Sequence, residues 1–344
     1  MAPSTRSPVT RETEPAADPV DEFDWIRRCL MPLAADAPES LGLADDAALI
    51  AARPGWDLVV SKDAMVEGVH FLPDDPLDGV ARKLLRANLS DLAAKGAEPY
   101  GYFLAVAWPK GCGWARREAF ARGLAEDQAR FGLKLFGGDT VTASGGLTLS
   151  LTILGWVPAG EMVRRCGARP GQVVLVSGTI GDAVLGLEAA QGGLSTLSTA
   201  DREALADRYR RPRPRLEAAV ALRRWACATA DVSDGLVADA GHIAEASGVR
   251  IELDLDQSPL SPATSAWLEA QPDRALALVR LATGGDDYEL VCTADPDAAD
   301  RLIADCAARG LPMRVIGRVA EGQGVEVRCH GALVAVGQAG YRHG

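Results

Sequence analysis

Aspartates recur along the 344-residue chain where a backbone can approach a ligand closely, at predicted strand ends and beside glycines. Carboxylates that converge cannot all stay ionised without cations. Hard oxygen ligands of this kind select Mg²⁺, which bridges carboxylates to phosphates. Each aspartate alone could instead cap a helix or shape a turn, and spacing leaves both interpretations open. The positions are Asp45-Asp46, Asp63, Asp91, Asp139, Asp231, Asp234 and Asp286-Asp287.

Other site chemistries find less support in the sequence. It contains no P-loop, no G-x-G-x-x-G after a strand and no G-x-S-x-G nucleophile motif. The segment Ser177–Asp182 links a predicted strand to a predicted helix, so its amides could hold a phosphate, or it could be an ordinary turn. The four histidines show no metal-site spacing with a cysteine or with one another: His70, His242, His330 and His343.

The elements that must position these side chains alternate between short apolar runs and amphipathic segments, which is typical of an α/β fold. Leu85, Leu89 and Leu92 fall at i, i+4 and i+7, which predicts one buried helical stripe. The predicted helices are Gly79–Lys95, Arg116–Phe131, Ala183–Gln191, Arg213–Trp225, Val237–Ser247 and Pro296–Arg309. The predicted strands are Leu58–Ser61, Tyr102–Trp108, Leu133–Phe136, Leu147–Val157, Val173–Ser177, Ile251–Leu255, Tyr288–Thr293, Met313–Val319 and Val325–Cys329.

Two polar stretches punctuate this pattern. Arg164–Gly171 predicts a connection between two halves, so we place a domain boundary near residue 160. Gly192–Asp201 is expected to be a loop, and residues 1–21 a solvated, disordered tail. The expected domains are therefore 22–160 and 161–344.

Composition excludes several classes of protein. A formal charge of −11 argues against a nucleic-acid partner, which needs a basic face. No apolar stretch is long enough to span a membrane, and no apolar core of a signal peptide is expected. Seven scattered cysteines without a C-x-x-C pair indicate reduced thiols and a cytoplasmic location.

Six motifs, in this order along residues 22–344, resemble those of the thiamine-monophosphate kinase family, within the aminoimidazole ribonucleotide synthetase superfamily. The blocks are several residues long, so together they are specific. They are Asp45-Asp46-Ala47-Ala48-Leu49, Val66-Glu67-Gly68-Val69-His70-Phe71, Asn88–Ala97, Gly137-Gly138-Asp139-Thr140, Asp231–Leu236 and Gly284–Leu290.

The resemblance implies a two-domain α/β (α+β) fold of the aminoimidazole ribonucleotide synthetase type. Its N-terminal domain would form a homodimer, and its C-terminal domain would be α/β. It implies Mg²⁺-assisted transfer of the ATP γ-phosphoryl group to thiamine monophosphate, giving thiamine diphosphate, with no covalent catalytic residue and several Mg²⁺ ions. The implied metal ligands are Asp46, Ser61, Asp63, Asp91, Asp139, Asp231 and Asp234. The implied ATP-binding residues are Gly138, Asp139, Arg165 and Ser233, and the implied substrate-binding residues are His70, Asp286 and Tyr341.

Three of these residues also have plain structural interpretations. His70 could be a hydrogen-bonded core or turn histidine, Arg165 a solvated loop cation, and Tyr341 a terminal aromatic plug. As binding residues, Tyr341 could stack against a substrate ring, and the permanently charged guanidinium of Arg165 could bind polyphosphate.

The sequence departs from the family pattern at three positions. Ala44 replaces a glycine, Lys62 replaces a threonine, and Asp286 replaces a glutamate one methylene longer. If the family needs only the carbonyl at position 62, the change is tolerable. If it needs the hydroxyl, one metal is lost or replaced by the ammonium.

Three alternatives stay open. A selenophosphate synthetase should show a reactive cysteine in a glycine-rich loop, whereas Cys29 lies within Ile26–Leu30. A hydrogenase maturation factor should end in cysteine, whereas this chain ends Tyr341–Gly344. A non-catalytic nucleotide-binding protein would explain Lys62, although the retained aspartates argue against it.

Overall fold

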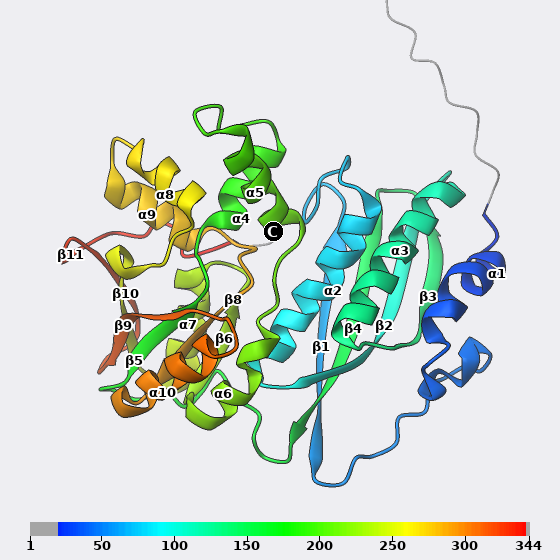
Figure 1. Cartoon of the computed structure of the whole chain (residues 1–344), viewed down its shortest axis with the longest axis horizontal. Coiled ribbons are helices and arrows are strands. Elements are labelled where there is room, and N and C mark those ends of the chain that lie inside the picture. The colour runs from blue at the N-terminus through cyan, green and yellow to red at the C-terminus, as the bar shows by residue number, and fades with distance from the viewer. Residues whose placement is uncertain (1–19, 342–344) are drawn as a thin grey trace, which may run out of the picture.

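The computed structural model describes residues 20–341, and places two sheets side by side, each with its own helices (Figure 1). The expected tail, 1–21, lies almost wholly outside the described residues. The first sheet uses residues 56–158 and the second uses 173–333, so the boundary near residue 160 stays a prediction. No described helix is both long and apolar enough to cross a membrane.

The first sheet has four strands in the order β1-β4-β2-β3. β1 and β2 pair antiparallel with β4, while β2 and β3 are parallel neighbours. The expected stripe of Leu85, Leu89 and Leu92 on α2 is fully buried against this sheet. The elements are α1 (Glu22–Trp25), η1 (Ile26–Leu30), η2 (Met31–Ala34), η3 (Pro38–Leu43), β1 (Trp56–Val66), α2 (Leu77–Ala94), β2 (Glu98–Pro109), α3 (Trp114–Phe131), β3 (Leu135–Ala143) and β4 (Thr148–Pro158).

The two faces of this sheet differ. In β1, Val59 and Met65 are buried on the face that α2 covers. Successive side chains of a strand point to opposite faces, so Leu58 and Val60 lie on the other face, where both are exposed. Val141 of β3 is exposed there too.

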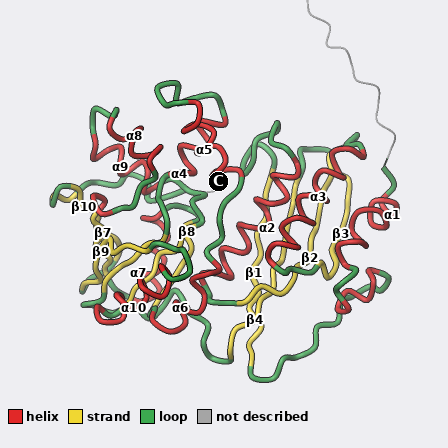
Figure 2. The backbone as a smooth tube through the Cα atoms, viewed as in Figure 1, coloured by secondary structure: helices red, strands yellow, loops and turns green. Residues whose placement is uncertain are grey.

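The second sheet has seven strands in the order β11-β10-β7-β9-β5-β8-β6. Helices α7, α8 and α9 pack with one apolar cluster and α6 and α10 with another, so both faces are covered. In Figure 2, the strands of this half lie among its helices. The elements are β5 (Val173–Ser177), α4 (Asp182–Ala190), α5 (Thr199–Arg210), η4 (Leu216–Ala218), α6 (Ala219–Trp225), β6 (Ala228–Val232), α7 (Leu236–Ser247), β7 (Arg250–Asp254), η5 (Leu255–Gln257), α8 (Pro262–Glu269), α9 (Arg274–Thr283), β8 (Glu289–Ala294), α10 (Pro296–Ala307), β9 (Met313–Ala320), β10 (Gly324–Cys329) and β11 (Ala332–Leu333).

Several element predictions were wrong. The expected loop Gly192–Asp201 runs into α5, which begins at Thr199 after Ser198 caps its first turn. The expected helix Arg213–Trp225 is α-helical only from Ala219, because Pro212 and Pro214 delay its start. Strand β6 and helices α5, α8 and α9 were not predicted.

The prediction that the aspartates of the first sheet lie at the ends of strands was also wrong. Asp63 lies inside β1, and Gly137-Gly138-Asp139 lies inside β3 rather than in a turn after Phe136. A Cβ at Gly138 would stand 1.8 Å from the Leu104 carbonyl oxygen, so glycine lets β3 pass close to β2.

Candidate active site

Four of the predicted aspartates converge where the two sheets meet. Asp63 comes from β1 and Asp91 from the last turns of α2, while Asp231 is the next-to-last residue of β6 and Asp234 lies just after that strand. Ser61, two residues before Asp63 and on the same face of β1, donates a 2.6 Å hydrogen bond from Oγ to Asp91 Oδ2. We call Asp63, Asp91, Asp231 and Asp234 the acidic cluster.

The pKa values of three members of the acidic cluster, Asp63, Asp91 and Asp231, record their burial and crowding. Burial, then the charges of Asp91 and Asp234, raise the pKa of Asp63 to about 7. Burial and then Asp91 raise the pKa of Asp231 well above its ordinary value. Burial also raises the pKa of Asp91, against the Ser61 hydrogen bond and the charges of Lys95 and Arg165. The cluster is short of positive charge, and oxygen donors short of positive charge fit Mg²⁺.

Asp239 of α7 holds the loop that carries Asp234. Its Oδ2 accepts backbone N–H groups of Ser233, Asp234 and Gly235 at 3.0, 3.0 and 3.2 Å. The side chain is 1% exposed, and burial followed by the Asp234 charge raises its pKa to about 7. Sequence reasoning missed this residue, although an aspartate four residues after a glycine turn is a recognisable loop-binding position.

A cavity of about 530 Å³ opens beside the acidic cluster. It is lined by residues from both halves of the chain, and six of them were singled out from the sequence. Those six are Asp63, His70, Ser233, Asp234, Asp286 and Tyr341. A second cavity, of about 840 Å³, shares Asp234 and Tyr341 with it and extends along α7.

Lys83 of α2 joins the two halves of the chain beside this cavity. Its Nζ lies 2.8 Å from Asp286 Oδ2 and 2.9 Å from the His70 carbonyl oxygen, and 3.7 Å from the centre of the Tyr209 ring. Lys83 is 2% exposed, so the ion pair with Asp286 is shielded from water on the lysine side. The backbone of Asp286 adopts φ +70°, which non-glycine residues rarely do and which surrounding contacts must maintain. Lys83 was also missed, since a lysine within an apolar helix pattern gives no separate signal.

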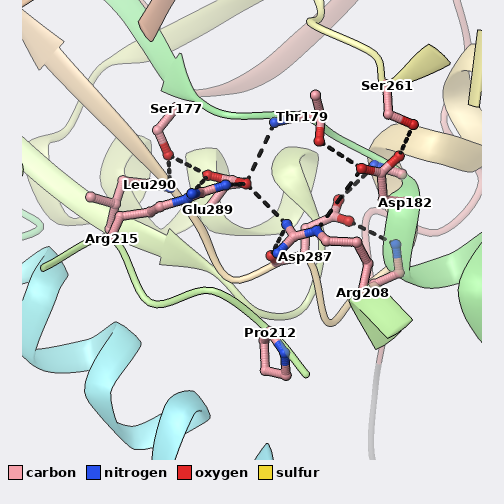
Figure 3. Close-up of polar contacts among 12 residues, drawn as sticks. Ser177, Thr179, Asp182, Arg208, Pro212, Arg215, Ser261, Asp287, Glu289 and Leu290 are labelled. Atoms are coloured by element: carbon pink, nitrogen blue, oxygen red, sulfur yellow. Dashed lines mark hydrogen bonds and ion pairs between the residues drawn. The ribbon is translucent and has the colours of Figure 1, made fainter. Parts of the chain in front are cut away.

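A buried polar network fixes the segment after Asp286 (Figure 3). The fully buried Glu289 accepts hydrogen bonds from Ser177 Oγ at 2.6 Å and Arg208 Nη2 at 3.0 Å, and pairs with Arg215. Asp287 accepts the backbone N–H groups of Gly181 and Ala183, 2.6 and 3.0 Å away, at the start of α4. These contacts tie the segment that carries Asp286 to α4, α5 and β5.

The remaining predicted residues lie elsewhere. Asp46, Gly138 and Asp139 line a separate cavity of about 290 Å³. Strands β1 and β3 are three strand spacings apart, so Gly138 and Asp139 are about 14 Å from Asp63 across the sheet. Asp139 is paired with Ala105 and is two residues before the exposed Val141, so both side chains of β3 point to the same face of the sheet. Asp63 points to the opposite face, which α2 covers. The seven predicted metal ligands are therefore divided within one chain.

Two further sequence positions are placed by the fold. Arg165 is exposed in the connection after β4, and its charge acts on Asp91, Lys95 and Asp239, so it lies beside the acidic cluster. Lys62 is exposed and alternates with Ser61 and Asp63 along β1, so its side chain points to the other face. Its ammonium therefore stands apart from the acidic cluster.

Comparisons with known proteins agree with this architecture. Residues 44–157 match the N-terminal domain of AIR synthase related proteins, and residues 169–330 match the C-terminal domain. A thiamine-monophosphate kinase of Caulobacter vibrioides is 54% identical over an alignment of 356 positions that covers all of both chains. The chain belongs to the thiamine-monophosphate kinase family.

Solved structures of this family share the fold of the chain. The thiamine-monophosphate kinase of Stenotrophomonas maltophilia is 39% identical, with a TM-score of 0.79 over 92% of this chain and 97% of its own. AaThiL complexed with AMPPCP and TMP is 30% identical, with a TM-score of 0.74 over 94% of this chain and 96% of its own. The expected two-domain α/β fold is confirmed, and the chain is a member of a kinase family rather than of the rival families considered above.

Proposed function

We propose that the chain transfers the γ-phosphoryl group of ATP to the phosphate of thiamine monophosphate. A phosphate oxygen of thiamine monophosphate bonds to the γ-phosphorus, and the bond from that phosphorus to the β,γ-bridging oxygen breaks. The products are thiamine diphosphate and ADP, which carries away the bonding electron pair. Neither step needs a covalent bond to the protein.

The observation that carries this proposal is the cavity in which the acidic cluster meets His70, Asp286 and Tyr341. The lining offers the carboxylates of Asp63 and Asp234 for cations that carry phosphates, and the Tyr341 ring and the Asp286 carboxyl group for an organic cation. A relative that is 54% identical over the full chain bears the name of this activity. Thiamine monophosphate combines a phosphate with a cationic ring, so it matches both kinds of lining.

The protein's own contribution is positioning. Lys83 and the Glu289 network would hold Asp286 against the organic part of the substrate, and Asp239 would fix the loop that presents Ser233 and Asp234. Ser61, Asp63, Asp91, Asp231 and Asp234 would hold Mg²⁺ on this side. The bound ions would supply the positive charge that lets two phosphates approach each other. Arg165 would contribute a permanent charge to the ATP phosphates.

We further propose that the site is completed by a second copy of the chain. Asp139 is about 14 Å from Asp63 across the sheet and points to its other side, and Asp46 and Gly138 line the same separate cavity as Asp139, so these residues need another chain to reach an acidic cluster. Leu58, Val60 and Val141 are apolar and exposed on that same face, and a homodimer would bury them. The ATP-binding role of Gly138 and Asp139 would then be exercised in the neighbouring subunit's site.

A direct assay tests the function. The purified protein is incubated with ATP, Mg²⁺ and thiamine monophosphate, and thiamine diphosphate and ADP are separated by chromatography. Equal amounts of the two products, formed only when the acceptor is present, would support the proposal. Tight ATP binding without either product would instead favour a nucleotide-binding protein without this activity.

The cell compartment belongs to the same proposal. All seven cysteines are free. Free thiols throughout the chain support the expected cytoplasmic location. The location is tested by labelling the protein with a thiol reagent as it comes from cells, before any reducing agent is added.

A further inference from the structure

A second cluster of possible metal ligands lies at the far end of the C-terminal sheet, near β10 and β11 in Figure 1. It combines three ligand types, the carboxylate of Asp256, the thiol of Cys329 and the imidazole of His330. None of the three lines the cavities described above. The cluster is therefore separate from the phosphoryl-transfer site.

The fold explains why these residues meet. Strands β7 and β10 are parallel neighbours, and their last paired residues are Asp254 and Arg328. Two residues further along, the same register brings Asp256 opposite His330, at the shared carboxyl edge of the two strands. Cys329 ends β10 with its side chain buried. The sequence alone shows only an adjacent Cys-His pair, and β-sheet pairing adds the third ligand.

The distances in this cluster are those of a tetrahedral metal site. Asp256 Oδ1 lies 3.6 Å from Cys329 Sγ and 3.5 Å from His330 Nδ1. Zinc bonds of about 2.3 Å to sulfur, about 2.05 Å to nitrogen and about 2.1 Å to oxygen, at tetrahedral angles, give ligand separations of about 3.6 Å for S–O and about 3.4 Å for N–O. The three ligand atoms all lie within 4.8 Å of one another, so small side-chain shifts would bring all of them within reach of one ion.

We propose that Asp256, Cys329 and His330 bind a transition-metal ion of the Zn²⁺ class, with water as the fourth ligand. A thiolate and an imidazole favour such a metal over Mg²⁺, which prefers oxygen ligands. Binding releases the thiol proton of Cys329 and leaves a thiolate on the metal. The ion would clip the ends of β7 and β10 together, at the start of the segment that leads to Tyr341.

The test measures Zn²⁺ and Co²⁺ binding to the full chain in excess Mg²⁺, which fills the oxygen-ligand sites. We expect about one tightly bound Zn²⁺ per chain by elemental analysis after dialysis. With Co²⁺, a thiolate-to-metal charge-transfer absorption should appear. The matched control is Cys166→Ser, which removes an exposed thiol outside the cluster and should leave both signals unchanged.

Two variants remove one ligand each. Cys329→Ser should abolish the thiolate absorption. His330→Asn should weaken Zn²⁺ binding by about tenfold or more, because a ligand is lost. His330 has an exposed side chain and a backbone φ of +50°, which asparagine tolerates, so this variant should fold even if Cys329→Ser does not.

The outcomes decide between a metal site and a hydrogen-bonded trio. If the wild-type chain retains no Zn²⁺ in excess Mg²⁺, the three residues only hydrogen-bond to one another and the proposal is wrong. It is equally wrong if His330→Asn binds Zn²⁺ as tightly as the wild type. Kinase activity is measured on the same samples, so a failure of the Zn²⁺ proposal can be told apart from a failure of the proposed function.

Discussion

Mixed oligomers test whether two chains share one site. Asp63→Asn and Asp139→Asn should each lower turnover by about 100-fold or more, because each removes charge from the proposed metal-binding set. The two side chains are about 14 Å apart across the sheet and on opposite faces. Two ligands of one Mg²⁺, each about 2.1 Å from the ion, can be at most about 4.2 Å apart. One ion therefore cannot join them within a single chain.

Mixing the two variants should restore activity if sites are shared. A mixed dimer would hold one site with both substitutions and one site with neither. Random pairing of equal amounts makes about half of the dimers mixed, so the mixture should reach about one quarter of the wild-type specific activity. The assay is ADP release after the variants are unfolded and refolded together, compared with each variant refolded alone.

A second mixture supplies the control. Asp63→Asn and Asp91→Asn both alter the acidic cluster, so every site in their mixed dimers carries one substitution, and activity should stay at the level of the parents. If the Asp63→Asn and Asp139→Asn mixture also stays at that level while gel filtration shows dimers, the shared site is refuted. Each chain would then hold a complete site of its own.

Three other predictions concern the same cavity. The folded-state pKa of Asp63 is raised to about 7, so its contribution to the stability of the metal-free protein is lost as the pH rises from about 4 through about 7. Mg²⁺ binds the charged form, so the rise in melting temperature on adding Mg²⁺ should grow over that range, and a gain independent of pH would contradict this. Asp239→Ala should cost about 2 kcal/mol in urea unfolding and raise the KM for ATP, because three loop amides lose their acceptor. Lys83→Met should raise the KM for thiamine monophosphate more than that for ATP, since Asp286 loses its buried partner, and equal changes in both would count against that role.

Sequence patterns predicted the long, strongly patterned elements best. Val173–Ser177 has the bounds that were predicted, because a continuous apolar run is buried on both faces of a central strand. Ala228–Val232 was missed, since two alanines and an aspartate give weak strand propensity, and its burial comes from β8 and α7. Gly137-Gly138 imitates a turn, but close approach to β2 requires glycine within the strand.

The site was predictable as a set of residues but not as an arrangement. The pattern of aspartates at strand ends and beside glycines, and then the family resemblance, named Asp63 and Asp139 together, and only the strand order places them at opposite edges. Lys83 and Asp239 act through buried contacts whose partners lie far along the chain or in a backbone loop. Lys83 leaves no pattern in the sequence, and Asp239 leaves only its spacing of four residues from Gly235. The face of the sheet to which the Lys62 side chain points followed from the alternation of side chains along a strand, once the bounds of β1 were known.

The proposed division of the aspartates between two chains would also solve a folding problem. Burial and the charges of Asp91 and Asp234 already raise the pKa of Asp63 to about 7, so two more carboxylates in the same place would disfavour the folded chain further at neutral pH. With Asp46 and Asp139 exposed at a separate cavity, a single chain can fold before any cation binds. Cations and nucleotide would then be needed where two chains meet, and the dimer should be more stable with both than with neither. Sedimentation at decreasing protein concentration, with and without Mg²⁺ and ATP, measures this coupling, and an unchanged dissociation constant would count against it.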